Sequence, residues 1–455
     1  MAFTIHGALK WWARECPNQI ALSVEDQPLT FLELWSWAGR TADYLAKLGV
    51  KPGDRVAAVA MNSLEYAVLA FGLMRAGALA TPLSFRSTAH EIADAFSDTT
   101  PVLAFADRDR QAVLAEALGA EGASKLKLLD DIGRLRDGPE VDFAFEPDAD
   151  TPVFIIGTSG STARPKGVIY SHRSILTYAS EFVIMEPRCG RGSRVLSVGP
   201  FSSSSGYLLL MQFISVGATL YIERHFEAAR ALRLLVEHQI TTFQSAPIFF
   251  ERIAALPGFA DADLSHLYWT QVGGARVSQS LLKAWRDKGV VLRQLYGSTE
   301  AGGGWGARDD AAVSAPEKCG RGGIFTEYAI LSENGGFAPP GTPGEILVRS
   351  PCLMVGYWNN PQATQEAVRD GWLHTGDLGI LDDAGNLTFV DRLKDIIISG
   401  GLNISAAEIE RVISEIDGVK EVAVLSARDA DFGETPLAVI YSDDGKVSVP
   451  VVIEH

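Results

Sequence analysis

The sequence has few of the residues that mark a disulfide scaffold or a zinc protein. Its four cysteines, Cys16, Cys189, Cys319 and Cys352, show neither C-x-x-C spacing nor a neighbouring histidine cluster. Structural disulfides and zinc sites depend on such groupings. We therefore expect reduced thiols, no zinc site and a cytoplasmic protein.

Long apolar stretches are also missing. The most apolar window, residues 66–83, contains Arg75 and two glycines, whereas a membrane-spanning helix needs about 20 predominantly apolar residues. The N-terminal residues lack the basic stretch and apolar core of a signal peptide. The sequence therefore predicts neither a transmembrane segment nor a secretory leader.

Positive charge is in the minority. The chain has 40 Lys and Arg against 56 Asp and Glu, a formal net charge of -16. Nucleic acids and anionic membranes are bound by basic surfaces, so we expect no nucleic-acid partner. An anionic ligand must instead be held by local positive groups. The sequence does not predict the oligomeric state.

Short apolar runs alternate with amphipathic helices over the first two thirds of the chain. Residues 20–24 and 56–60 are predicted strands, and residues 31–48 and 64–75 are predicted helices with caps at Thr30 and Ser63. The same alternation resumes after residue 167 and ends with a strand at 291–295. Strands that alternate with helices indicate an α/β fold with mostly parallel sheets. We expect two such sheets.

The pattern of alternating strands and helices ends near residue 320. Short strands separated by Pro and Gly turns predict a small antiparallel β-barrel over about residues 320–392. A Ser405 to Glu408 capping box and two further strands then predict a small α+β domain. We place the boundary at residues 392–395, which gives an N-terminal domain of residues 1–392 and a C-terminal lid domain of residues 393–455.

The loop at residues 157–167, GTSGSTARPKG, lies between two apolar runs. Its glycines permit unusual backbone conformations, and its hydroxyls, backbone N–H groups and Lys166 can together hold an anion. Pro165 stands where the Walker phosphate loop requires glycine, so the loop is not of that type. By itself it fits either a phosphate loop or a flexible surface turn.

Two further segments favour the phosphate loop. Residues 273–275 and 296–304 are also rich in glycine or hydroxyls and also follow predicted strands. Ligands of open α/β sheets bind at the carboxyl ends of the strands. Three such segments at strand ends therefore predict a ligand site that contains phosphate.

Four segments in this order resemble the motifs of the AMP-forming adenylating superfamily, which includes acyl-CoA and aryl-CoA synthetases, amino-acid adenylation domains and beetle luciferases. They are residues 158–167 (TSGSTARPKG), 296–300 (YGSTE), 371–377 (GWLHTGD) and 391–395 (DRLKD), the last followed by 400–404 (GGLNI). The resemblance covers essentially the whole chain. It implies a large ATP- and acyl-binding body and a small lid.

The resemblance also implies a reaction in two steps. A carboxylate attacks the α-phosphate of ATP to give acyl-AMP and pyrophosphate, and a thiol, usually coenzyme A, then displaces AMP. ATP, Mg²⁺ and coenzyme A would be the cofactor and co-substrates, and a small carboxylic acid would be the substrate. The catalytic residues implied are Lys166, Thr299, Glu300 and Arg392, of which Glu300 would bind the metal.

The remaining roles are carried over position by position. The phosphate loop would use Thr158, Ser159, Gly160, Ser161, Thr162 and Lys166. Tyr296 and Gly297 would contact adenine, Thr299 the α-phosphate, Asp377 the ribose hydroxyls, and Arg392 the ribose or phosphates. Gly273, Gly274 and Ala275 would line the adenine and acyl pocket. The acyl-pocket residues implied are Ser203, Gly206, Gln244, Gly274 and Gly302, and Lys394 would be the hinge.

The sequence departs from the family pattern in three places. Ala163 replaces a usual glycine, and residues 200–206 lack the carboxylate that pairs with the ammonium of an amino acid. An acid with an uncharged aliphatic or aromatic tail is therefore favoured. The catalytic lysine of the family lid has no match, since Lys446 follows too soon after Asn403, so the lid is expected to be incomplete.

Four functions remain open at this point. An acyl-CoA synthetase fits all four motifs. A homologue that binds ATP or acyl-AMP without efficient turnover fits the missing lysine. A stand-alone adenylation domain for a carrier protein and a luciferase-like oxygenase share the same motifs.

Overall fold

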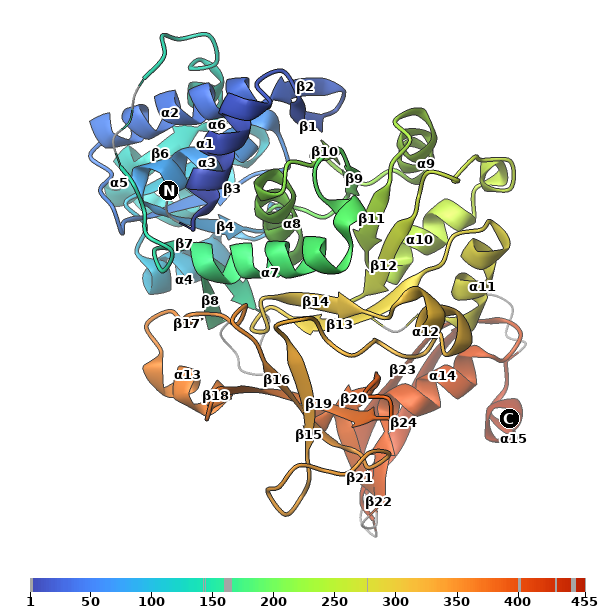
Figure 1. The fold of residues 1–455 in the computed structure, drawn as a ribbon. Helices are drawn as coiled ribbons and strands as arrows, with labels where there is room; N and C mark the ends of the chain where they lie inside the picture. The colour runs from blue at the N-terminus through green and yellow to red at the C-terminus, as the bar shows by residue number, and fades with distance from the viewer. Residues whose placement is uncertain are drawn as a thin grey trace.

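Two α/β sheets form the body of the protein, and two antiparallel sheets follow them (Figure 1). This computed structural model describes residues 3–141, 143, 145–158, 166–275, 277–399, 402–429, 432–442 and 447–454. In Figure 1 the blue N-terminal sheet and the green-to-yellow sheet lie side by side. The orange and red sheets lie below them.

The first sheet has seven strands in the order β17-β8-β7-β4-β3-β5-β6. Their bounds are β3 Arg55–Val59, β4 Leu79–Leu83, β5 Leu103–Ala106, β6 Leu126–Leu128, β7 Pro152–Thr158, β8 Lys166–Ser171 and β17 Gly356–Tyr357. Strands β3 to β7 are parallel, whereas β8 and β17 are antiparallel. The helices of this region are α2 Phe31–Lys47, α3 Leu64–Ala76, α4 Ala89–Thr99, α5 Gln111–Gly122 and α6 Leu129–Gly133.

The second sheet has eight strands in the order β14-β13-β12-β11-β9-β10-β1-β2. Their bounds are β1 Ile20–Val24, β2 Gln27–Thr30, β9 Arg194–Ser197, β10 Thr219–Ile222, β11 Thr242–Ser245, β12 Trp269–Gly273, β13 Arg293–Ser298 and β14 Gly303–Gly306. The six inner strands are parallel and both edge strands are antiparallel. The helices are α7 His172–Met185, α8 Ser204–Ser215, α9 Ala228–Glu237, α10 Pro247–Ala254, α11 Gln279–Asp287 and α12 Asp309–Ser314.

The N-terminal strand β1 belongs to the second sheet, although most strands of that sheet come much later in the chain. Residues 22–24 pair in parallel with residues 220–222 of β10 on one side and antiparallel with residues 27–29 of β2 on the other. The helix α1, Ile5–Glu15, packs against α2, α3, α7 and α8. The N-terminal segment therefore adds two strands to the second sheet before the chain enters the first sheet.

The largest apolar core is shared by both sheets. The largest cluster of buried side chains includes residues of β1, β3 and β10 together with α3 and α8. Every residue of α3 except Glu65 is buried, as is every residue of α8 from Gly206 onward. Helices that are apolar all round belong inside a protein. The core therefore holds the carboxyl edges of the two sheets in a fixed relation.

The C-terminal third contains two antiparallel sheets. The first joins β15 Glu327–Leu331, β16 Gly344–Arg349, β18 Val368–Arg369, β19 Trp372–Leu381 and β20 Leu387–Arg392, with α13 Pro361–Ala367 beside it. The second joins β21 Ile396–Ser399, β22 Leu402–Ser405, β23 Val419–Asp429 and β24 Gly433–Ser442, with α14 Ala406–Ser414 and α15 Val449–Glu454. These sheets confirm the predicted change from mostly parallel to antiparallel strands in this part of the chain.

Local start signals in the sequence are observed as helix caps. Thr30 Oγ1 accepts from Glu33 N at 3.2 Å, and Glu33 Oε2 accepts from Thr30 N at 2.7 Å, which is the predicted capping box. Ser63, Ser171 and Ser278 also cap the predicted helices. Side-chain oxygens at these positions satisfy backbone N–H groups that the first helical turn leaves unpaired.

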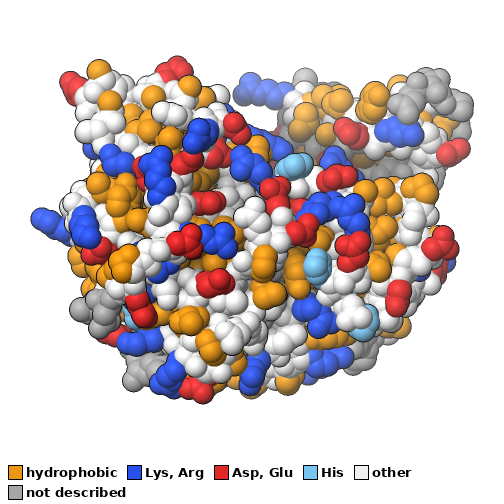
Figure 2. Space-filling view, turned by 90° about the horizontal axis from the view of Figure 1, so that it is seen from above, with side chains coloured by type: hydrophobic (Ala, Val, Ile, Leu, Met, Phe, Trp, Pro, Cys, Tyr) orange, Lys and Arg blue, Asp and Glu red, His pale blue; other side chains and the backbone are white. Residues whose placement is uncertain are grey.

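The surface carries charges of both signs. Figure 2 shows one face on which basic and acidic side chains are interspersed among apolar ones. Among the described residues, no helix combines the length and the apolar character that crossing a bilayer demands.

Two buried histidines lie where α1 meets α7. The side chains of His6 and His172 are each 1% exposed. His172 Nδ1 accepts a hydrogen bond from Ile5 N at 3.2 Å, so this nitrogen carries no proton. Burial, and then the charge of Arg75, lower the pKa of His6 to about 4. Burial and the neighbouring His6 lower the pKa of His172 to about 3.

We expect the stability of the protein to fall as the pH drops from about 6.5 to about 4. The unfolded chain binds protons at the ordinary histidine pKa of about 6.5, whereas the folded chain does not until the lowered values are reached. Between pH 7 and pH 5, His6 alone should remove about 2 kcal/mol of unfolding free energy. Urea denaturation of the wild type and of His6→Gln at both pH values measures this loss. Equal losses in the two proteins would contradict the assignment.

Candidate active site

The loop at residues 157–167 connects two antiparallel strands. Thr158 and Lys166 are register partners at the end of the β7–β8 hairpin, and Thr158 Oγ1 donates to Lys166 O at 3.3 Å. The predicted residues Ser159, Gly160, Ser161 and Thr162 lie outside the described residues. Lys166 Nζ lies 5.0 Å from the centroid of the Tyr357 ring.

The carboxyl ends of β12 and β13 form the neighbouring edge of the site. These strands are parallel partners, so the turn at 273–275 and the segment at 296–300 follow side by side. Gly274 has a φ of +79°, and Gly274 and Ala275 are exposed. A Cβ on Gly273 would stand 2.7 Å from Leu295 O, which explains the glycine by the close approach of β13.

Tyr296 connects β13 with the antiparallel sheet below it. Its hydroxyl donates to Asp377 Oδ2 at 2.7 Å, and its ring stacks on Phe389 with 6.1 Å between centroids and 24° between planes. The Tyr296 side chain is 6% exposed, so a base that stacks on it must share the ring with Phe389. Gly297 lies opposite Gly304 of β14, where side chains would collide.

Asp377 and Arg392 face each other across β19 and β20. They are register partners, and Arg392 Nε lies 3.7 Å from Asp377 Oδ1. Burial raises the pKa of Asp377, while the Tyr296 hydrogen bond and Arg392 oppose this shift. The turn before Asp377 is held by Glu345, whose Oε1 accepts from Gly376 N at 3.0 Å.

Thr299 and Glu300 form the turn after β13. Thr299 Oγ1 lies 3.0 Å from Ser204 Oγ in a hydrogen bond, and the Tyr170 hydroxyl donates to Thr299 O. Tyr357 donates its hydroxyl proton to Glu300 Oε1 at 3.0 Å. Glu300 itself is partly exposed.

The donor set at Glu300 fits one kind of metal. The described residues contain no group of three or more His, Cys, Asp or Glu side chains that could hold an ion. Mg²⁺ is usually bound through one or two carboxylates together with substrate phosphates and water. A single accessible carboxylate beside the predicted phosphate loop therefore fits Mg²⁺ that arrives with ATP.

Four of the five predicted acyl-pocket residues contact the protein in ways that explain them without a ligand. Ser203 caps α8: its Oγ accepts from Gly206 N at 3.1 Å and donates to Pro200 O at 2.8 Å. A Cβ on Gly206 would collide with Pro200 O, and one on Gly302 with Cys352 O. Gln244 Nε2 donates to Gln271 Oε1. Their contact with an acyl chain, and that of Gly274, stays a prediction.

The predicted hinge lies in the short 3-10 turn Leu393–Asp395 between β20 and β21. The side chain of Lys394 and all of Lys446 lie outside the described part of the structure. Ser405, which caps α14, donates to Asp391 Oδ2 beside the turn. The sheet of β21 to β24 is thus tied to the end of β20, directly before Arg392.

Sequence reasoning missed several residues that contact the site. Ser204, Tyr170, Glu345, Phe389 and Tyr357 all touch a predicted site residue. Of these, Ser204 alone lies in a segment that the sequence had singled out. Tyr357 lies in the run Gly356-Tyr357-Trp358. This pair of aromatic residues after a glycine is a sequence signal that could have identified Tyr357 as a candidate.

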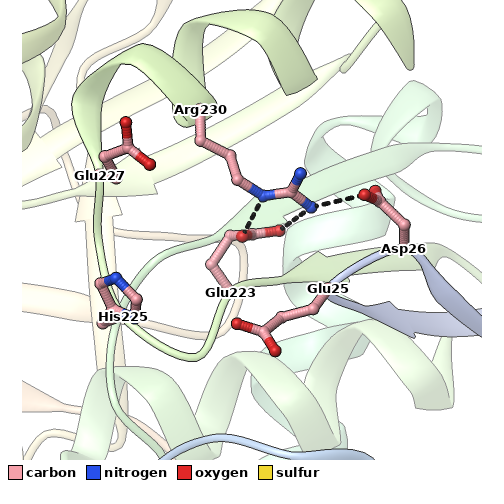
Figure 3. A pocket seen from close by; sticks show the side chains of 6 residues that line it. All are labelled: Glu25, Asp26, Glu223, His225, Glu227 and Arg230. Atoms are coloured by element: carbon pink, nitrogen blue, oxygen red, sulfur yellow. Dashed lines mark hydrogen bonds and ion pairs between the residues drawn. The ribbon is translucent and has the colours of Figure 1, made fainter.

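A pocket further along the same edge of the eight-stranded sheet is of a different kind. It has a volume of about 260 Å³ and is lined by Glu25, Asp26, Glu223, His225, Glu227 and Arg230 (Figure 3). Figure 3 shows Arg230 between Glu223 and Asp26, and it forms ion pairs with both. This guanidinium is already paired with two carboxylates, and four of the six lining residues are acidic, so the pocket does not favour a phosphate.

The comparisons with known proteins agree on one family. The family whose profile matches residues 9–358 is described as AMP-binding enzyme. Over 437 residues the chain is 33% identical to a long-chain-fatty-acid–CoA ligase, FadD13, of Mycobacterium tuberculosis (strain CDC 1551 / Oshkosh), with 94% of this chain and 86% of that protein covered. Over 444 residues it is 35% identical to a feruloyl-CoA synthase of Amycolatopsis sp, with 95% and 87% covered.

The fold is also similar to that of a solved structure. ATP-bound MatB from Rhodopseudomonas palustris superposes with a TM-score of 0.92 at 26% identity, over 100% of this chain and 92% of that chain.

Two glycines of the site should respond differently to substitution. Gly302 and Gly274 have nearly equal φ values, +81° and +79°, but only Gly302 lacks room for a Cβ. Gly274→Ala should cost about 1 kcal/mol of unfolding free energy through backbone strain. Gly302→Ala should cost roughly 1–3 kcal/mol more, because the methyl group collides with Cys352 O. Chemical denaturation of both variants measures the difference, and equal losses would contradict the close approach.

Proposed function

The chain belongs to the AMP-binding enzyme family, and we propose that it is an acyl-CoA synthetase, an AMP-forming acid–thiol ligase. It would convert a carboxylic acid, ATP and coenzyme A into acyl-CoA, AMP and pyrophosphate. We further propose that residues 393–455 act as a lid that turns about Lys394.

The observation that carries this proposal is the Tyr296–Asp377 hydrogen bond of 2.7 Å. It joins two motifs that lie 81 residues apart. Arg392, from a third motif, lies 3.7 Å from the same carboxylate. An aromatic ring, a carboxylate with two acceptor oxygens and a guanidinium together suit adenine, ribose hydroxyls and phosphate. The arrangement supports a nucleotide site at this edge of the sheet.

In the first step a carboxylate oxygen of the acid forms a bond to the α-phosphorus. The bond from that phosphorus to the bridging oxygen of the β-phosphate breaks, and pyrophosphate leaves. Lys166 and the hydroxyls of the β7–β8 loop would stabilise the charge that develops on pyrophosphate, and Thr299 would hold the α-phosphate. Mg²⁺ bound at Glu300 would neutralise phosphate charge.

In the second step the thiol sulfur of coenzyme A attacks the acyl carbon. The bond between this carbon and the phosphate oxygen breaks, AMP leaves, and the thiol proton goes to solvent. Asp377 and Arg392 would keep the AMP part in place through both steps, which makes the attack effectively intramolecular.

The acid itself is proposed to have an uncharged aliphatic or aromatic tail. Every predicted acyl-pocket residue is uncharged: Ser203, Gly206, Gln244, Gly274 and Gly302. The buried carboxylate of Glu181 already accepts hydrogen bonds from Trp305 Nε1 at 2.7 Å and Thr326 Oγ1 at 3.0 Å. It is therefore occupied and does not serve as a partner for a substrate ammonium.

We expect ATP–pyrophosphate exchange that depends on an aliphatic or aryl carboxylic acid and is absent with amino acids. Glu300→Gln should lower the exchange rate by on the order of a hundredfold, because a carboxylate that holds the metal at the phosphates is lost. Glu237→Gln, an exposed residue at the end of α9, is the matched control. Radiolabelled pyrophosphate incorporation into ATP measures the rate.

The acceptor is tested by thiol consumption and thioester formation in the same mixtures. Exchange with coenzyme A thioester formation supports the ligase. Exchange without the thioester would indicate a carrier-protein acceptor instead. ATP binding without any acid-dependent exchange would contradict the proposal and leave a nucleotide-binding homologue.

A further inference from the structure

A short segment outside the four motifs holds two of them together. We call residues 352–358 the strap. Met354 N donates to Glu300 O at 3.0 Å, while Val355 N donates to Ile169 O at 2.9 Å and Trp358 N to Gly167 O at 2.7 Å. The strap therefore binds the turn after β13 on one side and strand β8 on the other.

The strap has little freedom to shift. Its Cys352 carbonyl lies against Gly302 so closely that a Cβ there would collide with it. Tyr357 N donates to Thr364 Oγ1 of α13 at 2.9 Å, and Gly356 has a φ of +155°. The backbone of Tyr357 is thus fixed by the β17–β8 pairing and by α13.

The side chain of Tyr357 contacts two charged groups of opposite sign. Its hydroxyl donates to Glu300 Oε1 at 3.0 Å, and its ring lies under Lys166 Nζ at 5.0 Å. Among the described residues, Glu300 Oε2 has no hydrogen-bond partner. Tyr357 thereby engages one carboxylate oxygen and leaves the other available.

We propose that Tyr357 is a positioning residue that holds Glu300 and Lys166 in place for Mg²⁺ and the phosphates of ATP. Its hydroxyl fixes the carboxylate so that Oε2 is the ligand, in the way that outer-shell partners orient metal ligands. Its ring face keeps the ammonium of Lys166 over the site through a cation–π contact. Glu and Lys both lose considerable rotamer freedom when they are ordered, and Tyr357 removes part of that cost before ATP binds.

The proposal rests on the proposed function only in its choice of ligand, and binding can test it without turnover. Isothermal titration calorimetry gives the ATP affinity in excess Mg²⁺ and in EDTA, and the ratio of the two is the Mg²⁺ coupling. Tyr357→Phe keeps the ring and removes the hydroxyl. We expect it to lower the coupling about tenfold and to leave the affinity in EDTA unchanged.

Tyr357→Leu removes the ring as well. It should lower the coupling to the same extent and also weaken ATP binding in EDTA about three- to fivefold, because Lys166 loses its cation–π partner. In a Glu300→Gln background, Tyr357→Phe should have no further effect on the coupling, since the carboxylate it orients is gone.

Tyr268→Phe is the matched control. Tyr268 also lies under a cation, with Arg188 4.6 Å from its ring centroid, and its hydroxyl also donates a hydrogen bond, to Arg188 O. It precedes β12, at the opposite end of that strand from Gly273. This variant should leave both ATP affinities unchanged, and the melting temperature of each variant shows that it is folded.

Three results would overturn the inference. They are a wild type whose ATP affinity does not respond to Mg²⁺, a Tyr357→Phe variant with wild-type coupling, and an equal loss in the Glu300→Gln background. The proposed function fails separately, when the wild type shows no acid-dependent pyrophosphate exchange. The coupling experiment then still decides the role of Tyr357.

Discussion

The site depends on one hydrogen bond between two sheets, from the Tyr296 hydroxyl to the buried carboxylate of Asp377. Tyr296 lies within strand β13 of the mostly parallel sheet, and Asp377 lies in the middle of the antiparallel strand β19. A buried carboxylate is costly unless it is hydrogen-bonded or paired. Asp377 has both kinds of partner, the hydroxyl of Tyr296 and the guanidinium of Arg392. Loss of this hydrogen bond would therefore leave the buried carboxylate short of a partner, which destabilises the fold, and would weaken the contact between the two sheets.

Features that depend on neighbouring residues were predictable from the sequence. The cap at Thr30 and the strand at residues 20–24 follow from side chains a few positions apart, and both are observed. The partner of β1 was not predictable, because β10 lies almost 200 residues further along the chain. The alternation of apolar and polar residues in a strand indicates which face of the strand is buried, but it does not indicate which other strand lies beside it. The antiparallel β7–β8 hairpin likewise needed the structure, since two apolar runs fit either direction.

The same division applies to the candidate site. The motifs at Glu300 and Asp377 could be recognised from their residue types, but the contacts between motifs could not. Gly302 is an example: the resemblance placed it in the acyl pocket, and only the structure shows that a Cβ at this position would collide with the carbonyl of Cys352. Tyr357 is another, because its importance comes from facing Glu300 and Lys166 at once. No periodicity in its own segment encodes that arrangement.

The electrostatics of the candidate site are dominated by carboxylates. The chain has a net charge of -16, and Glu300 and Glu345 each help to raise the pKa of Asp377. A site with three neighbouring carboxylates repels a free polyphosphate, and few cations lie beside it. ATP that carries Mg²⁺ brings its own positive charge and meets a carboxylate with an oxygen available. In the proposed function, the acidic edge of the sheet would therefore favour the metal complex over the bare nucleotide, and Lys166 and Arg392 would hold phosphate charge that the metal does not cover.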